Sequence, residues 1–165
     1  QRGERALVFL ESREMQARLT GLLQRRYGLV SPPLLINGAV SGRHRQGRVD
    51  DFQSRSGFDV MLLSPKAGGV GLTLTAANHV IHLSRWWNPA VENQATDRVY
   101  RIGQRRPVTV YLPRAIHPVF GDHSFDVQLH KLLSRKIDLF NRLMVPPQFG
   151  EGDFDDLFSK TTRGL

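Results

Sequence analysis

The chain has 165 residues, 40% of them hydrophobic, which suits a globular domain with a buried core and excludes a disordered chain. It has no cysteine, which excludes disulfides and thiolate metal sites, and no apolar run or signal segment indicates a membrane protein. The net charge is +8, and all but four of the 23 Lys and Arg residues are Arg, whose planar fork suits phosphate. This charge favours a nucleic-acid partner, while a GC-rich genome is the alternative explanation for the arginines.

Short apolar runs alternate with amphipathic segments along the chain. Strands are predicted at 6–10, 34–36, 60–63, 79–83 and 108–112. Helices are predicted around Met15, Leu19, Leu22 and Leu23, from Ser41 to about Gln53 with Val49 and Phe52 inward, from Asn88-Pro89 to about Tyr100, and from Ser124 to Met144. The alternation predicts an α/β fold with a parallel β-sheet and helices on both faces. Ligands of such sheets bind at the carboxyl ends of the strands.

A glycine-rich stretch, SPKAGGVGLTLTAA at 64–77, follows the third predicted strand. Its glycines allow a ligand to approach the backbone closely, its exposed amides can bind an anion, and Lys66 adds a positive charge. The stretch has neither the GK[ST] of a Walker A loop nor the G-x-G-x-x-G spacing of a dinucleotide site. Because glycine-rich turns are common after strands, this signal is weak by itself.

An arginine-rich stretch, NQATDRVYRIGQRR at 93–106, has one acidic residue, Asp97. If the predicted helix continues to Tyr100, then Gln94, Asp97, Arg98 and Arg101 share one helical face. These residues could form a solvated surface, with an Asp97–Arg101 pair worth well under about 1 kcal/mol. They could equally form a phosphate-binding edge, because two arginines one turn apart can reach one triphosphate.

The segment LLSPKAGGVGLTLTAANHVIHLSRWWNPAVENQATDRVYRIGQ resembles the C-terminal helicase lobe of the SWI/SNF-type DNA-dependent ATPases, superfamily-two motors that translocate on double-stranded DNA. KAGG-x-GL-x-LT resembles motif V, WNP the short element after it, and Q-x-x-D-R-x-x-R-I-G-Q motif VI. Gly38, Arg45 and Phe52 match motif IV in spacing. The resemblance covers residues 5–112 and the long helix, and three ordered motifs are more specific than any one of them. RWWNPAVE and LPRAIHPVFGDHSFD resemble bacterial members.

The resemblance implies a nucleotide-facing set of residues. Arg98 and Arg101 would be arginine fingers for the γ-phosphate of ATP, which the N-terminal lobe would hold with Mg²⁺. Gln94 would position that phosphate or the attacking water, and Asp97 belongs to the same nucleotide-binding set. The implied cleft-facing glycines are Gly69 and Gly71.

The resemblance also implies a DNA-facing set: Lys66, Thr73, Trp87 and Arg45. Lys66 would contact a DNA phosphate, and Trp86 is expected to be packed in the core. Arg105 and Arg106 are expected to face solvent, with DNA phosphates as the alternative. The sequence departs from the family pattern at Pro65, Thr73, Ser84 and Tyr100, which affects the detail of DNA contact more than the ATP chemistry.

Three regions are expected from the resemblance: a RecA-like lobe at 1–115, a loop and brace helix at 116–144, and an acidic-aromatic tail at 145–165. Because the chain starts at Gln1 and carries no Walker A loop or DEXH box, we expect a segment of a longer protein that cannot hydrolyse ATP alone.

The expected partners are double-stranded DNA, the N-terminal RecA-like lobe of the same polypeptide, and a protein that binds the tail at 151–158. No metal ligand set is expected. The expected location is the bacterial cytoplasm at the nucleoid, or the nucleus of a eukaryote. The alternatives are a DNA- or protein-binding module with relic motifs, and a lobe of an RNA helicase.

Overall fold

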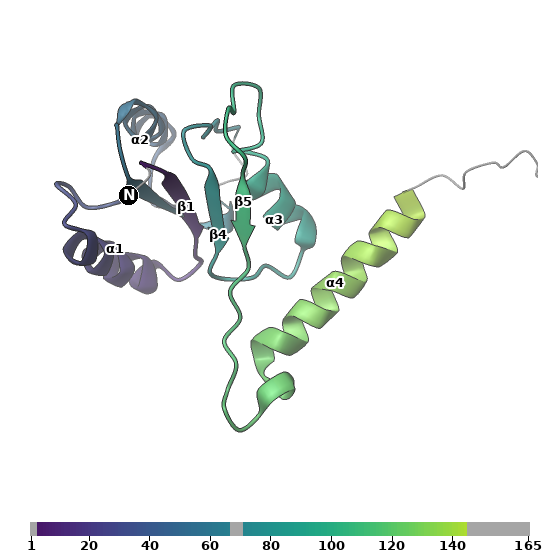
Figure 1. The fold of residues 1–165 in the computed structure, drawn as a ribbon. Coiled ribbons are helices and arrows are strands. Elements are labelled where there is room, and N and C mark those ends of the chain that lie inside the picture. The colour runs from purple at the N-terminus through teal and green to yellow at the C-terminus, as the bar shows by residue number, and fades with distance from the viewer. Residues whose placement is uncertain (1–2, 67–70, 145–165) are drawn as a thin grey trace, which may run out of the picture. The chain divides into compact units, whose positions relative to one another are not determined.

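The computed structural model describes residues 3–66 and 71–144, and its centre is a five-stranded parallel sheet (Figure 1). The strands are β1 (Arg5–Phe9), β2 (Leu34–Ile36), β3 (Asp59–Leu63), β4 (His79–His82) and β5 (Thr109–Tyr111). Their order across the sheet is β2-β3-β1-β4-β5, and every neighbouring pair is parallel. The helices are α1 (Arg13–Tyr27), α2 (Gly42–Ser54), α3 (Pro89–Thr96), α4 (Phe125–Met144) and the short η2 (Gly121–His123). This arrangement confirms the predicted α/β class and the C-terminal helix.

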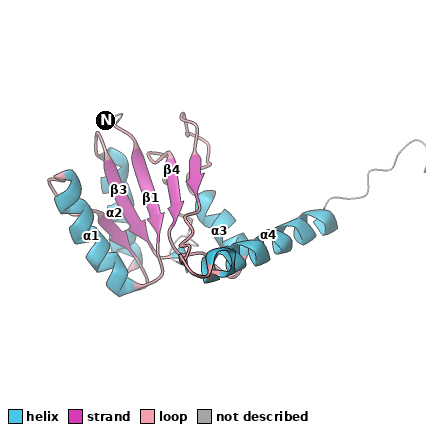
Figure 2. Ribbon diagram, turned by 60° about the horizontal axis from the view of Figure 1, so that its bottom comes forward, coloured by secondary structure: helices cyan, strands magenta, loops and turns pink. Residues whose placement is uncertain are grey.

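Helices cover both faces of the sheet (Figure 2). On one face, Val49 and Phe52 of α2 and Ala95 of α3 pack into the larger core with alternate residues of the strands, such as Leu7. On the other face, Leu19 and Leu23 of α1 pack against the smaller core. Alternation of side chains along each strand therefore divides the apolar residues between the two layers.

The core-facing side of α1 differs from a simple apolar stripe. Met15 is 48% exposed and Leu22 is 53% exposed, whereas Gln16 has no exposed surface. The Gln16 amide donates to the carbonyl of Leu10 at 2.5 Å and accepts from the amide of Asn37 at 3.0 Å. A buried amide network therefore ties α1 to the segments that follow β1 and β2, where polar backbone groups need partners.

Two predicted helix details are wrong. The helix expected to reach Tyr100 ends at Thr96, although it begins as expected, with Asn88 capping the backbone N–H of Ala90 at 3.0 Å and Pro89 in the first position. Ser41 precedes α2 but makes no side-chain cap, because its hydroxyl lies 2.7 Å from Nδ1 of His44.

The chain divides into two compact units, Gln1–Leu133 and Ser134–Leu165, and the sheet lies in the first. The expected region boundaries near 115 and 144 stay predictions. The tail at 145–165 lies outside the described residues. Within the described part of the chain, no helix is long and apolar enough to span a membrane.

Replacing Gln16 with Leu should lower the free energy of unfolding by about 1–3 kcal/mol, because the Leu10 carbonyl and the Asn37 amide lose their buried partner. Urea unfolding measures the change. Gln46→Leu on the exposed side of α2 is the matched control and should change stability by less than about 0.5 kcal/mol. Equal effects of the two substitutions would contradict a structural role for the amide network.

Candidate functional site

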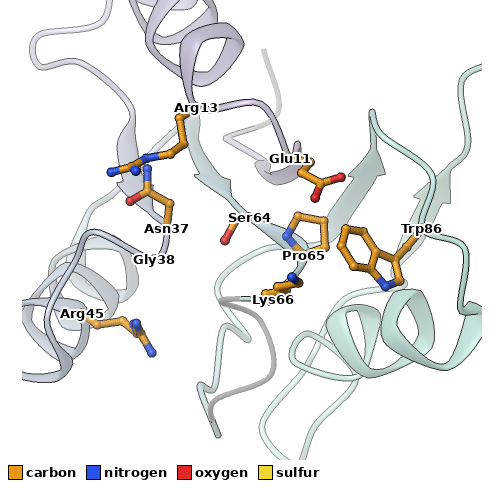
Figure 3. A pocket seen from close by; sticks show the side chains of 9 residues that line it. All are labelled: Glu11, Arg13, Asn37, Gly38, Arg45, Ser64, Pro65, Lys66 and Trp86. Carbon is orange, nitrogen blue, oxygen red and sulfur yellow. The ribbon is translucent and has the colours of Figure 1, made fainter.

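A pocket of about 300 Å³ lies at the carboxyl ends of the strands (Figure 3). Its walls come from the segments after β1, β2, β3 and β4, and from α2: Glu11, Arg13, Asn37, Gly38, Arg45, Ser64, Pro65, Lys66 and Trp86. The chain after β1 leads to α1 on one face, whereas the chain after β3 leads to Leu72 and Leu74 on the other. The pocket therefore lies where the two connections separate, the usual ligand position in open α/β sheets.

The pocket concentrates positive charge beside an aromatic ring. The Lys66 ammonium lies 5.5 Å from the ring centroid of Trp86, within the range of a cation–π contact. Arg45 donates from Nη2 to the carbonyl of Val40 at 3.1 Å. Its Nε is buried and has no hydrogen-bond partner among the described residues. A buried donor of this kind is costly unless an acceptor arrives, so the pocket is suited to an anion.

Two residues of the expected DNA-facing set lie away from this pocket. Trp87 is 58% exposed, and its ring meets that of Phe125 edge-on at 6.4 Å. Thr73 accepts a hydrogen bond from Nη1 of Arg101 at 3.1 Å. The expectation that Trp86 is core packing is wrong, because its half-buried ring lines the pocket. Because Trp86 and Trp87 are adjacent, the sequence alone does not indicate which of the two faces a ligand.

The segment after the glycine-rich loop is hydrogen-bonded to the arginine-rich segment. Leu74 donates its backbone N–H to the carbonyl of Arg98 at 2.9 Å, next to the Arg101–Thr73 bond. The Gln104 amide donates to the carbonyls of Ala77 at 2.7 Å and Thr75 at 3.1 Å. These bonds fix the arginine-rich segment against residues 73–77.

The expected helical face of Gln94, Asp97, Arg98 and Arg101 is wrong because α3 ends at Thr96 and Asp97 is its C-cap. The two arginines are nevertheless neighbours. Burial lowers the pKa of Arg98, which is 6% exposed, and repulsion from the Arg101 charge lowers it further, while Asp97 opposes both. Arg101 is exposed and pairs with no acidic side chain in residues 3–66 and 71–144.

The other expected nucleotide-facing residues are only partly placed. Gln94 and Asp97 are exposed at the end of α3. Gly71 has a φ of 31° and open space where a side chain would project. Gly69 lies outside the described residues. No group of three or more His, Asp or Glu side chains in the described ranges could hold a metal ion.

A buried ion pair, not anticipated from the sequence, holds the segment after β4. Arg85 binds Glu92 through two hydrogen bonds of 2.8 and 3.0 Å, and their side chains are 5% and 9% exposed. Glu92 also accepts the backbone N–H of Trp86 at 2.7 Å. A third donor of Arg85 lies 2.8 Å from Nδ1 of His130 in α4. Burial and the charges of Arg85 and Arg114 lower the pKa of His130.

The family model for the helicase conserved C-terminal domain matches residues 1–103, more than half of the chain. The chain belongs to the helicase C-terminal domain family. Within that family it is the C-terminal lobe of an SNF2-type helicase, as its relatives and structural neighbours agree.

Three comparisons define this helicase lobe further. A Bacillus subtilis protein named "Putative ATP-dependent helicase/translocase YwqA" is 51% identical over 108 residues, which are 66% of this chain and 11% of YwqA. The Zorya protein ZorD of Escherichia coli is 39% identical over 158 residues, 92% of this chain and 14% of ZorD. The SWI2/SNF2 ATPase core domain of Sulfolobus solfataricus superposes with a TM-score of 0.64 at 31% identity, covering 87% of this chain and 27% of that structure. The helicase lobe is therefore a small part of the proteins that it matches.

Replacing Glu92 with Gln should lower the free energy of unfolding by about 3–5 kcal/mol, because it leaves the Arg85 charge buried without its carboxylate. Replacing both members in Arg85→Met/Glu92→Leu should cost less than Glu92→Gln alone, since no uncompensated charge remains. Chemical denaturation of the three proteins tests both. If the double variant is less stable than Glu92→Gln, the cost of the single substitution does not come from an uncompensated buried charge.

Proposed function

We propose that this helicase lobe is the second motor lobe of an ATP-dependent double-stranded DNA translocase. Arg98 and Arg101 act on ATP that is held, with Mg²⁺, mainly by the N-terminal RecA-like lobe of the same polypeptide. The observation that carries the proposal is the cluster in which Arg101 bonds Thr73 and the carbonyl of Arg98 bonds Leu74. These bonds hold the Arg101 side chain and the backbone of Arg98 against Thr73 and Leu74, which follow the glycine-rich loop in the sequence.

The electrostatics of the arginine cluster favour a polyphosphate. Two neighbouring guanidinium charges repel each other, and burial adds to the cost at Arg98. A γ-phosphate that arrives on another lobe relieves this repulsion and accepts bidentate hydrogen bonds. As charge develops on the phosphoryl oxygens during transfer, a fixed arginine stabilises it. Gln94 and Asp97, at the exposed end of α3, extend the same nucleotide-facing surface. Gly71, which has open space where a side chain would project, is assigned to this surface as well.

The pocket of Figure 3 is the proposed contact with DNA. Lys66 and the unpartnered Nε of Arg45 are donors for a phosphodiester. Trp86 adds an aromatic wall and takes the role in this pocket that the sequence assigned to Trp87. Thr73 supports Arg101 instead of reaching the DNA itself.

One chain segment connects the two proposed contacts. Lys66 lies in the pocket after β3, and Thr73, later on the same connection to β4, bonds Arg101. Closure of the lobes on ATP would therefore move the segment that also holds the DNA. This coupling gives translocation along the duplex without a requirement for strand separation.

The lobe by itself should not hydrolyse ATP. The described residues offer guanidinium donors toward a nucleotide, whereas Mg²⁺ and the rest of the nucleotide would be held by the other lobe. The long helix α4 is proposed as the brace after the RecA-like lobe, and 151–158 as the segment for a protein partner. The motor would act in a DNA-containing compartment, the bacterial cytoplasm or a eukaryotic nucleus.

In the full-length protein, Arg101→Gln and Arg98→Gln should each lower DNA-stimulated ATP hydrolysis by about 10³-fold or more while ATP binding is kept. Steady-state hydrolysis and nucleotide binding are measured with and without duplex DNA. Arg26→Gln, which removes an exposed arginine at the end of α1, is the matched control and should have no effect. The 165-residue chain alone should show no hydrolysis.

Unchanged hydrolysis in both arginine variants would remove the finger assignment and favour a binding module with relic motifs. Stimulation by RNA in place of duplex DNA would favour an RNA helicase lobe. Hydrolysis by the 165-residue chain alone would overturn the dependence on a second lobe.

Lys66→Gln should weaken duplex DNA binding and lower the slope of log affinity against log salt by roughly 0.9, the value for one phosphate contact. Trp86→Ala should weaken binding more than Trp87→Ala, because Trp86 lines the pocket. Fluorescence anisotropy at several salt concentrations measures both effects. Lys131→Gln removes an exposed lysine elsewhere and is the charge control. A larger effect of Trp87→Ala would place the DNA outside the pocket.

A further inference from the structure

A second concave site lies at the opposite edge of the sheet from the pocket of Figure 3. It has a volume of about 390 Å³ and is lined by residues from the amino ends of β1, β3, β4 and β5, including Arg5, Arg55, Arg105 and Arg106. We call this site the arginine hollow. All five strands are parallel, so the hollow and the pocket cannot belong to one binding site.

Two of its arginines are held rigidly. Arg5 donates to the backbone carbonyls of Phe52 at 2.6 Å and Gly57 at 3.3 Å, and no carboxylate in residues 3–66 and 71–144 pairs with it. Arg55 bonds two carboxylates, Asp51 at 2.7 Å and Asp59 at 3.1 Å, so it adds no net positive charge to the hollow. Of these two arginines, Arg5 is therefore the one that gives the hollow a positive charge.

The other two arginines are exposed on the rim. The backbone N–H of Arg106 donates to Oε1 of Gln104 at 2.9 Å, and its Nη1 lies 3.4 Å from the carbonyl of Gly3. Neither Arg105 nor Arg106 pairs with a carboxylate in residues 3–66 and 71–144. Both are exposed, beside Arg5 and Arg55 in the same hollow, so they are open to the DNA phosphates that the sequence left as the alternative to solvent. The rim thus adds two uncompensated charges to the hollow.

The hollow leaves its backbone open to a ligand. Gly57 and Gly103 have φ values of 81° and 103°, which a side chain rarely adopts, and a Cβ at either would point into open space. Ala76 is the only apolar side chain of its described lining, so no apolar wall is available for a peptide side chain. Open backbone, guanidinium forks and the absence of lining acids match phosphate oxygens.

We infer that the arginine hollow binds the phosphodiester backbone of a nucleic acid, as a second contact separate from the motor pocket. Arg105 and Arg106 each contact a phosphate, and Arg5 supplies the fixed charge behind them. The lobe then holds two stretches of nucleic acid, one at each edge of its sheet. Arginine pairs with phosphate in a planar, bidentate manner, and a polyanion supplies several phosphates at once.

The test compares Arg105→Gln/Arg106→Gln with Arg25→Gln/Arg26→Gln in the full-length protein. Both variants remove two adjacent exposed arginines, so the loss of net charge is matched. The hollow variant should lower the salt slope of duplex DNA binding by about 2, since each lost contact removes roughly 0.9, and the control should leave the slope unchanged. Thermal melting establishes that both variants are folded.

Combination with Lys66→Gln separates this site from the motor pocket. Because the two sites lie at opposite edges of the sheet, their effects on DNA affinity should add. The hollow variant should keep the ATP hydrolysis rate of the wild type at saturating DNA, whereas an Arg101 variant should not. If Lys66→Gln leaves DNA binding unchanged while the hollow variant weakens it, the hollow is supported and the motor pocket is not.

Equal slopes for the hollow variant and the control would overturn the inference. A titration with inorganic phosphate forms the second arm. If phosphate binding depends on Arg105 and Arg106 but the DNA affinity does not, the hollow is a site for a small phosphate compound, and its assignment to nucleic acid is wrong.

Discussion

The buried ion pair between Arg85 and Glu92 constrains the placement of the functional surface. Glu92 lies in the first turns of α3, accepts two bonds from Arg85 and one from the backbone of Trp86, and so fixes how the chain leaves β4. Arg85 also reaches His130 in α4. The pocket wall at Trp86 and the start of α3 are therefore set by one carboxylate. The attraction within a buried ion pair offsets the cost of desolvation only when the remaining donors and acceptors are also hydrogen-bonded, as they are here.

The connection from β3 to β4 contacts both candidate sites through its described residues. Its first residues line the pocket at the carboxyl edge, and its last residues are bonded to the arginine-rich segment through Arg98, Arg101 and Gln104. Gln104, the last residue of the motif, acts here as a structural clamp on backbone carbonyls. The pattern Q-x-x-D-R-x-x-R-I-G-Q thus combines residues that we propose to face the nucleotide with a structural residue, Gln104.

Sequence periodicity predicted the parallel sheet, because short apolar runs separated by helical segments have few other arrangements. It placed α3 correctly at Asn88-Pro89, where a cap and a proline act locally. Its end at Thr96 depended on tertiary bonds to Leu74 and Thr73, which no local pattern encodes. The roles of Gln16, Glu92 and Trp86 were missed for the same reason: each contacts segments that are distant in sequence.

The pairing of β1 has a consequence for the time at which this lobe becomes functional. Arg5 pairs with Asp59 and Ala6 with His79, so the central strand finds both neighbours only after much of the lobe has been synthesised. Such non-local pairing slows folding. Neither edge of the sheet can assemble before that step, so a partly synthesised chain emerging from the ribosome has neither the pocket of Figure 3 nor the arginine hollow.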